Sequence, residues 1–276
     1  MDYRYFSKNG ELLPLEEAVV PLSNIEYQYG FGVYENIRVQ NGIPYFLSEH
    51  LKRLEESARI IGLEHTFSDS TVEKYVANLI EKIEIGTYNL KILLIGAKSA
   101  ENASLYILPL NPRFPAKKIY HDGVACLTHE YERPFPHAKT LNMLGSYLAY
   151  RSASEADCYD ALLVNSRGCI TEGTRTNFFC IEGTTLFSAP ENEILLGVTR
   201  KAVLKVATDI GFKIEERDLT PENVSSYDGA FLTSTSSKIV PVRRIDERAC
   251  GKKLVSLAKL MKAFDQFLEE CRGKIE

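Results

Sequence analysis

A single carboxylate in a turn between two apolar runs constrains this chain more than any other feature. The turn, Ile170 to Asn177, reads Ile-Thr-Glu-Gly-Thr-Arg-Thr-Asn and separates the apolar runs at 161–164 and 178–179. Strand, turn and strand need no carboxylate there, and an isolated ionised carboxylate away from water is costly. We therefore expect a cation or a ligand at Glu172. An ordinary solvated turn of Thr, Gly and Asn is the alternative.

Length and charge narrow the class of protein. With 276 residues, 45% of them hydrophobic, the chain can bury a large core and is long enough for two domains. The net charge of −4 argues against a nucleic-acid-binding protein, which needs a basic surface. No window approaches the run of about 18 apolar residues that spans a bilayer, and no signal-peptide core opens the chain. We expect no membrane partner and a cytoplasmic location.

The cysteines and histidines predict neither a disulfide framework nor a metal site. The six cysteines include no Cys-x-x-Cys pair, and the five histidines are scattered without the spacing of metal ligands.

The hydrophobic pattern predicts an α/β chain in two domains. Two prolines at 110–118 favour an extended connection, which places the boundary between domains 1–115 and 116–276. Ser48 and either Ser68 or Ser70 are candidate N-caps, and Gly211 stands where a helix C′ residue belongs. The predicted strands are 38–40, 44–47, 90–95, 124–127, 161–164, 177–181, 185–187 and 230–232. The predicted helices are 49–63, 70–83, 140–156, 199–210 and 253–270.

Lys139 is the candidate partner in the chemistry at Glu172. It could be a surface lysine before a helix, or an amine that condenses with an aldehyde to form a Schiff base. A lysine-bound pyridoxal phosphate needs its ring nitrogen kept protonated by a carboxylate, and Glu172 would supply one.

Two segments suit the phosphate of such a cofactor. In 195–200, Gly197 permits close backbone approach and Thr199 opens the predicted helix 199–210. In 233–237, a run of hydroxyl residues follows a predicted strand. The alternatives are a plain N-cap at Thr199 and an ordinary loop.

Together these residues resemble the fold-type IV, class IV pyridoxal-phosphate aminotransferases, which include branched-chain and D-amino-acid aminotransferases and aminodeoxychorismate lyase. The resemblance covers nearly the whole chain. The segments that carry it are Tyr29–Glu35, Glu49–Leu54, Lys139–Asn142, Thr171–Asn177, Leu196–Arg200 and Phe231–Val242.

The resemblance implies a role for each matching residue. Lys139 would form the internal aldimine with pyridoxal 5'-phosphate and move the proton between Cα and C4′, and Glu172 would bind the pyridinium nitrogen. Leu195 would pack against the ring. Arg53 would bind the phosphate, which is sensible because a guanidinium presents a planar fork of donors. The further phosphate ligands would be Val198, Thr199 and Thr235.

The resemblance also implies the architecture and the pocket. We expect a small N-terminal α/β domain, a larger C-terminal pseudo-barrel domain with helices, a site between them, and a homodimer. The substrates would be an α-amino acid and a 2-oxo acid. The residues that would line the substrate pocket are Tyr29, Tyr34, Arg38, Lys91, Thr235 and Ser236. Core packing is the alternative for the two tyrosines.

The substrate markers conflict. Leu144 stands where branched-chain enzymes usually have tyrosine, which favours the D-amino-acid or lyase branches. The Arg-x-His carboxylate trap of one D-amino-acid group has no counterpart at 96–101, whereas Arg38 suits the branched-chain or lyase branches. Lys91 replaces an arginine common in branched-chain enzymes. The prediction is transamination of a branched-chain-like or D-amino acid, with aminodeoxychorismate lyase and a non-catalytic cofactor-binding protein as alternatives.

Overall fold

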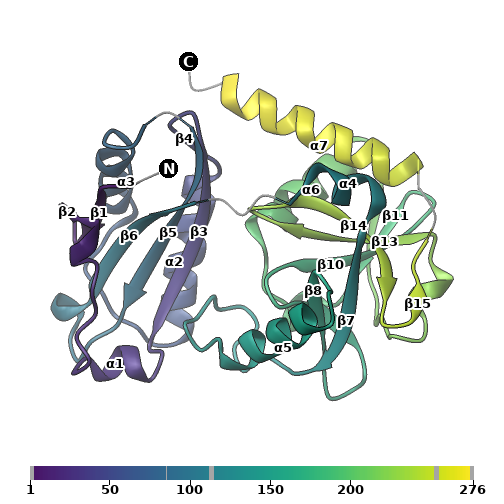
Figure 1. Ribbon diagram of the computed structural model, residues 1–276, viewed down its shortest axis with the longest axis horizontal. Helices are drawn as coiled ribbons and strands as arrows, with labels where there is room; N and C mark the ends of the chain where they lie inside the picture. The colour runs from purple at the N-terminus through teal and green to yellow at the C-terminus, as the bar shows by residue number, and fades with distance from the viewer. Residues whose placement is uncertain (1–2, 85, 112–114, 252–254, 274–276) are drawn as a thin grey trace. The chain divides into compact units, whose positions relative to one another are not determined.

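The chain divides into two compact units. The structure, a computed structural model, describes residues 3–84, 86–111, 115–251 and 255–273. One unit contains residues 1–113 and 137–143, and the other contains 114–136 and 144–276 (Figure 1). The segment 137–143 thus belongs with the first unit, which a single boundary at 115/116 does not anticipate. Part of the predicted connection, 112–114, lies outside the described residues, and the division into separately folding domains stays a prediction.

The first unit is an antiparallel sheet with helices. Its strands run in the order β2-β1-β6-β5-β3-β4, and every pair is antiparallel. The elements are β1 (Tyr5–Lys8), β2 (Glu11–Pro14), α1 (Ile25–Gln28), β3 (Gly32–Gln40), β4 (Ile43–Pro44), α2 (Leu47–Ile60), α3 (Asp69–Ile80), β5 (Thr87–Ile95) and β6 (Ser104–Leu110).

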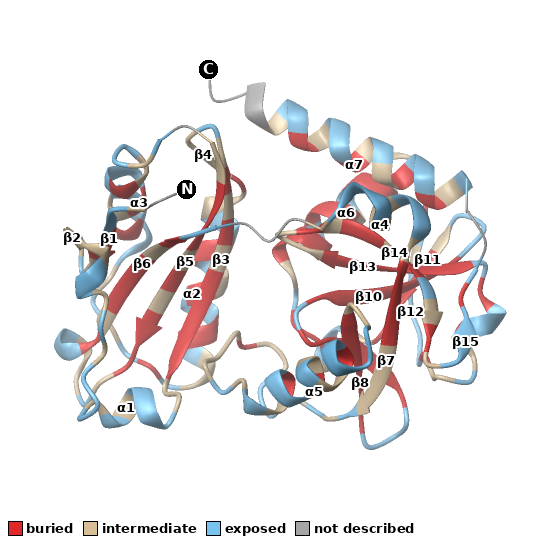
Figure 2. Ribbon diagram, in the orientation of Figure 1, coloured by how far each residue is buried: buried red, intermediate tan, exposed pale blue. Residues whose placement is uncertain are grey.

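One face of this sheet forms the core of the unit. Alternate residues of β3, such as Val33 and Ile37, pack with Leu51 of α2 and Val76 of α3 in one apolar cluster. Figure 2 shows the buried positions along β3, β5 and the inner face of α2. Because side chains alternate across a strand, Glu35 has the same parity as Val33 and Ile37 and enters this apolar face.

The helix starts of the first unit correct two predictions. The segment 44–47 is not a strand, because β4 ends at Pro44 and α2 begins at Leu47. Ser48 is not the N-cap of α2: that position is Phe46, in a left-handed conformation with φ 56°. Ser68 does cap α3, and its side chain accepts a hydrogen bond from the N–H of Thr71.

The second unit contains a longer, mixed sheet. The strand order is β12-β11-β10-β13-β14-β7-β8-β9, with β15 beside β14. The pairs β11–β12, β14–β7 and β7–β8 are parallel. The elements are α4 (Lys117–Asp122), β7 (Val124–Glu130), α5 (Leu144–Glu155), β8 (Asp160–Val164), β9 (Ile170–Gly173), β10 (Asn177–Glu182), β11 (Thr185–Ser188), α6 (Val198–Asp209), β12 (Lys213–Glu216), β13 (Gly229–Ser234), β14 (Lys238–Ile245), β15 (Arg248–Ala249) and α7 (Val255–Gly273).

The connection from β9 to β10 forces this sheet to curl. The two strands stand five positions apart in the sheet order, which is about 24 Å in a flat sheet. Yet the chain passes from Gly173 to Asn177 in four steps, a reach of at most about 14 Å. The sheet must therefore bend until β9 approaches β10, and the N–H of Gly173 donates to the carbonyl of Thr176 at 2.8 Å.

Some predicted helix ends of the second unit are confirmed, and others are wrong. α5 begins at Leu144 rather than at 140, because Thr140 and Leu141 bond to β3. Thr199 is not an N-cap: α6 begins at Val198, after Gly197. Gly211 is the predicted C′ residue, with φ +92°. The N–H of Gly211 donates to the carbonyl of Thr208, and the N–H of Phe212 donates to the carbonyl of Ala207. These are the two hydrogen bonds of a Schellman motif.

The C-terminal helix α7 covers the described part of the predicted helix 253–270 and continues to Gly273, and residues 252–254 lie outside the described residues. Among the described helices, none has the length and apolar character needed to cross a membrane.

Candidate active site

Lys139 lies in an extended segment that is attached to β3 and α2. Its carbonyl accepts from the N–H of Tyr34 at 2.9 Å, and its own N–H donates to the hydroxyl of Ser57 at 3.1 Å. Thr140 then forms a β-bridge with Val33. These bonds hold the backbone of Lys139 on both sides, although it belongs to no strand or helix.

A glycine permits this attachment. A Cβ added to Gly32 would lie 2.7 Å from Leu141 Cδ1 and 2.8 Å from the carbonyl oxygen of Leu94. Any side chain there would push the Lys139 segment away from β3, and the bond from the Leu141 N–H to the Gly32 carbonyl, 2.8 Å, would be lost.

Arg53 is held by a buried carboxylate that the sequence prediction did not include. Its Nε and Nη2 donate to the two oxygens of Glu35 at 2.6 and 2.7 Å. Nδ1 of His50 lies 2.6 Å from Glu35 Oε2, and Glu35 and His50 are both fully buried. Burial raises the pKa of Glu35, but the charge of Arg53 and the hydrogen bonds from Arg53 and His50 oppose it, and that pKa is held at about 2.

Burial lowers the pKa of His50, and the charges of Arg53 and Lys139 lower it further. The attraction of Glu35 acts in the opposite direction, but we take burial to prevail and treat His50 as neutral at pH 7. Since a carboxylate only accepts, the Nδ1 of the neutral ring carries the hydrogen and donates to Glu35.

Three predicted substrate residues share the other face of the sheet. Tyr34 and Arg38 have the same parity on β3, and Lys91 pairs with Asn36 between them. The ammonium groups of Lys139 and Lys91 lie 4.5 and 5.3 Å from the centre of the Tyr34 ring. Tyr29 is not in this group: it ends α1 and is 80% exposed.

In the second unit, Glu172 is buried at the curled end of the sheet. Both of its oxygens lie 3.3 Å from the N–H of Leu195, and Asn177 Nδ2 donates to Oε2 at 3.3 Å. Arg133 Nε lies 3.1 Å from Oε1. That N–H does not point at the oxygen, so the contact is an ion pair without a hydrogen bond at Nε. Nη2 of Arg133 donates instead to the carbonyl of Thr174 at 2.8 Å.

The protein thus supplies a cation of its own at Glu172, Arg133, which the sequence prediction did not name. Nothing in the local sequence distinguishes Arg133, because the connection before Lys139 has no periodic pattern. Asn177, a residue of the predicted turn, donates from Nδ2 to both Glu172 Oε2 and the carbonyl of Leu195, the second at 2.7 Å.

Two hydroxyl residues of the turn form hydrogen bonds with a buried carboxylate. Thr174 and Thr176 donate their hydroxyls to Asp160, a fully buried carboxylate of β8, the second at 2.9 Å. Burial raises the pKa of Asp160, and these bonds offset part of that rise. The two threonine hydroxyls therefore offset part of the cost of burying the carboxylate of Asp160.

The start of α6 brings the predicted phosphate residues together. The hydroxyls of Thr199 and Thr235 lie 3.4 Å apart, which joins α6 to the turn between β13 and β14. Val198 is the first residue of the helix, and Ser236 follows Thr235 in the turn. Gly197 has no side chain to cap the helix, and a Cβ there would lie 2.2 Å from Asn177 Oδ1. First-turn N–H groups and two hydroxyls suit an anion.

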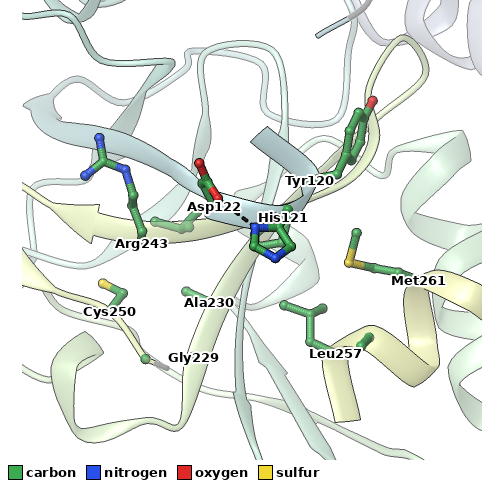
Figure 3. A pocket seen from close by; sticks show the side chains of 14 residues that line it. Tyr120, His121, Asp122, Gly229, Ala230, Arg243, Cys250, Leu257 and Met261 are labelled. Atoms are coloured by element: carbon green, nitrogen blue, oxygen red, sulfur yellow. Dashed lines mark hydrogen bonds and ion pairs between the residues drawn. The ribbon is translucent and has the colours of Figure 1, made fainter. Parts of the chain in front are cut away.

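A separate pocket of about 240 Å³ lies in the second unit between α4, the strands β13 and β14, and α7 (Figure 3). The described residues that line it include none of the predicted site residues. Its polar groups do not converge, because Arg243 and Tyr120 lie on opposite sides of the hydrogen-bonded pair His121 and Asp122. We do not assign the chemistry to this pocket.

Comparison with known proteins identifies the family. The profile of the family Amino-transferase class IV matches residues 32–245. A D-alanine aminotransferase of Bacillus licheniformis is 30% identical over 256 residues, which cover 88% of this chain and 89% of that protein. The crystal structure of a branched-chain aminotransferase from the archaeon Thermoproteus uzoniensis, with norvaline, is 26% identical with a TM-score of 0.85, over 95% of this chain and 93% of that one.

The branched-chain amino acid aminotransferase of Escherichia coli matches with a TM-score of 0.86 and the same coverage at 23% identity, which supports the fold alone. The predicted fold class and the resemblance read from the sequence are confirmed. The chain belongs to the class IV aminotransferases, pyridoxal-phosphate-dependent enzymes that transfer an amino group between an amino acid and a 2-oxo acid.

Proposed function

We propose that Lys139 and Glu172 act on one bound pyridoxal phosphate, and that the chain moves an amino group between an α-amino acid and a 2-oxo acid. The observation that carries the proposal is the fixed backbone of Lys139, held by Tyr34 and Ser57 while its amine lies 4.5 Å from the Tyr34 ring. When bound, the cofactor supplies an electron sink for cleavage of the substrate Cα–H bond. Lys139 is the residue that holds the cofactor covalently and carries the proton.

Glu172 is suited to the ring nitrogen. Its carboxylate contacts the Leu195 N–H, Asn177 and Arg133 at 3.1–3.3 Å, and its negative charge favours a protonated nitrogen beside it. Under this proposal the side chain of Leu195 packs against the ring.

The phosphate is proposed to bind at the start of α6. The N–H groups there, the backbone of Val198 and the hydroxyls of Thr199 and Thr235 donate hydrogen bonds to an anion. Arg53 supplies the compensating positive charge. Hydroxyls, backbone donors and a guanidinium are the donor set that a phosphate dianion requires, so these residues fit the cofactor.

The substrate carboxylates are proposed to meet Arg38 and Lys91 on the face of the sheet that carries Tyr34. The backbone of Thr235 and Ser236 is proposed to complete the pocket, whereas Tyr29, which lies apart from this group, stays a prediction. This arrangement suits a substrate that presents its carboxylate to cations and its side chain to the tyrosines.

Two classes of amino acid are supported as the substrate that donates the amino group. D-amino acids are favoured by Leu144 and by the 30% identity to a D-alanine aminotransferase. Branched-chain L-amino acids are favoured by Arg38 and by the 26% identity to a branched-chain aminotransferase.

We also propose a homodimer, formed through the segment 19–29. Leu22, Ile25 and Tyr29 are 91%, 51% and 80% exposed, and neighbouring apolar side chains left in water mark an interaction surface. Sedimentation of wild type and Leu22→Asp at one concentration tests this: a dimer that the substitution weakens supports it, and a monomeric wild type excludes it. The cytoplasmic location stays a prediction.

The activity is tested by mixing the holoenzyme with single amino acids and following the cofactor absorbance. We expect bleaching with D-alanine or with L-leucine, and recovery when a 2-oxo acid is added. Bleaching by neither enantiomer of any amino acid in a broad panel would contradict transamination. Pyruvate released from aminodeoxychorismate without an acceptor would indicate the lyase instead.

A further inference from the structure

The further feature is the buried network around Glu35, a polar group that enters the apolar face of the first sheet and lies outside the predicted substrate pocket. An ionised carboxylate inside an apolar face requires full compensation, and Glu35 receives it from three donors at 2.6–2.7 Å. Apolar residues at this position would suit the core as well or better. The presence of the carboxylate therefore calls for a reason beyond stability.

The network lies on the elements that hold Lys139. His50, Arg53 and Ser57 are separated by three and four residues and so share one face of α2. The first two bind Glu35, and the third accepts from the Lys139 N–H. On β3, the residue before Glu35 is Tyr34, whose N–H donates to the Lys139 carbonyl. One strand and one helix thus fix both residues.

The bond geometry fixes the plane of the Arg53 guanidinium. Glu35 engages Nε and Nη2, which are two of the five N–H donors, so the side chain cannot rotate about its last bonds without breaking one of them. A guanidinium whose orientation is set in advance loses less freedom when it binds an anion.

We propose that Glu35, with His50 behind it, is a positioning residue that presents Arg53 to the cofactor phosphate and so sets the preference for phosphorylated over unphosphorylated cofactor. This inference rests on the proposed role of Arg53.

If Glu35 positions Arg53, Glu35→Gln should weaken phosphate binding, whereas charge alone predicts that it should strengthen phosphate binding. Removing the charge of Glu35 would strengthen the attraction of Arg53 for a phosphate if charge alone mattered. In Glu35→Gln, however, the amide NH₂ must face a donor of Arg53 or the Nδ1–H of His50, so one bond is replaced by a repulsive contact. We expect the loss of orientation to prevail, and phosphate binding to weaken.

The test measures the dissociation constants of pyridoxal phosphate and of pyridoxal for the apoenzyme. Both aldehydes can react with Lys139, so their ratio isolates the phosphate contribution. We expect Glu35→Gln to lower the preference for pyridoxal phosphate by about fivefold to tenfold, the order of the cost of ordering one long side chain. Binding of pyridoxal should change less than twofold. An unchanged or larger preference would overturn the inference.

Three further variants keep the result interpretable. Arg53→Met should lose most of the phosphate preference; if it does not, the proposed role of Arg53 fails, independently of Glu35. Glu35→Asp retains the charge but is too short to reach both partners, so it should weaken the preference, and it serves if the Gln variant does not fold. Asp160→Asn removes another buried carboxylate and should leave the preference unchanged.

Discussion

Glu35 and Glu172 are both buried carboxylates on strands, and each has an arginine beside it, yet their surroundings differ. Glu35 receives a two-bond pair from Arg53 and a bond from His50 at 2.6–2.7 Å. Glu172 has longer contacts of 3.1–3.3 Å, and the Nε–H of Arg133 does not point at it. Glu35 is bound tightly by side chains, whereas these contacts of Glu172 are longer and come partly from the backbone.

The difference separates two uses of a buried acid. A tightly paired carboxylate fixes the orientation of its partners, which suits a residue that positions Arg53. A carboxylate with longer contacts can adjust to a charge that arrives with a ligand, which suits Glu172 in its proposed role. Both uses require burial, and only the bond geometry distinguishes them.

The largest expected effect concerns the stability given by Glu35. Its pKa is lowered from about 4.5 to about 2 on folding, so its contribution is present above pH 4.5 and is lost as the pH falls toward 2. Glu35→Gln should reduce the unfolding free energy of the apoprotein at pH 7 by about 3 kcal/mol. Urea unfolding followed by circular dichroism should show this difference shrinking below pH 4.5.

Asp160 supplies a control, because its contribution to stability should change with pH in the opposite direction. Burial raises its pKa, so its contribution to stability falls as the pH rises through the carboxyl range. Compared with wild type, Asp160→Asn should therefore show a relative stability that increases with pH. If both variants have the same pH trend, the contrast between the two acids is wrong.

The next effect concerns catalysis at Glu172. Glu172→Gln should retain the cofactor but slow transamination by about 100-fold, because a neutral amide favours the protonated ring nitrogen poorly. Stopped-flow measurement of a single half-reaction gives the rate. Glu193→Gln, which changes a more exposed glutamate that bonds Asn165, is the matched control and should stay near the wild-type rate. Equal rates in both variants would remove Glu172 from the site.

The smallest effect compares hydroxyl groups on one helix. Thr199→Val should weaken pyridoxal phosphate binding by about tenfold, the size of one hydrogen bond to a charged group. Thr208→Val removes a hydroxyl near the other end of α6, where it donates to Leu204, and should leave the affinity unchanged. Fluorescence titration distinguishes them. If the two variants bind equally well, the phosphate does not lie at the start of α6.

Local pattern predicted much of the fold. The C′ glycine at 211 and the N-cap at Ser68 follow from backbone chemistry within a few residues, and both are confirmed. The helix before residue 144 was wrong because tertiary pairing decided it: residues 139–141 bond to β3 and α2, far away in sequence. The start of α2 was wrong because Phe46 adopts a left-handed conformation that its residue type does not favour.

The site was only partly accessible from sequence. Glu172 is a predicted site residue because the sequence itself shows a carboxylate between apolar runs, and its burial is confirmed. Its partner Arg133 was missed because the two meet only through the curl of the sheet. Glu35 had a usable signal, its parity with Val33 and Ile37, but the bonds to His50 and Arg53 depend on how α2 packs on β3.

The most direct measurement is the site of covalent cofactor attachment. The holoenzyme is reduced with borohydride and digested, and the labelled peptide is sequenced by mass spectrometry. The account predicts the pyridoxyl group on Lys139, with no adduct in Lys139→Ala and an unaffected adduct in Lys118→Ala, an exposed lysine of α4. A label on any other lysine, or an adduct that survives in Lys139→Ala, would contradict it.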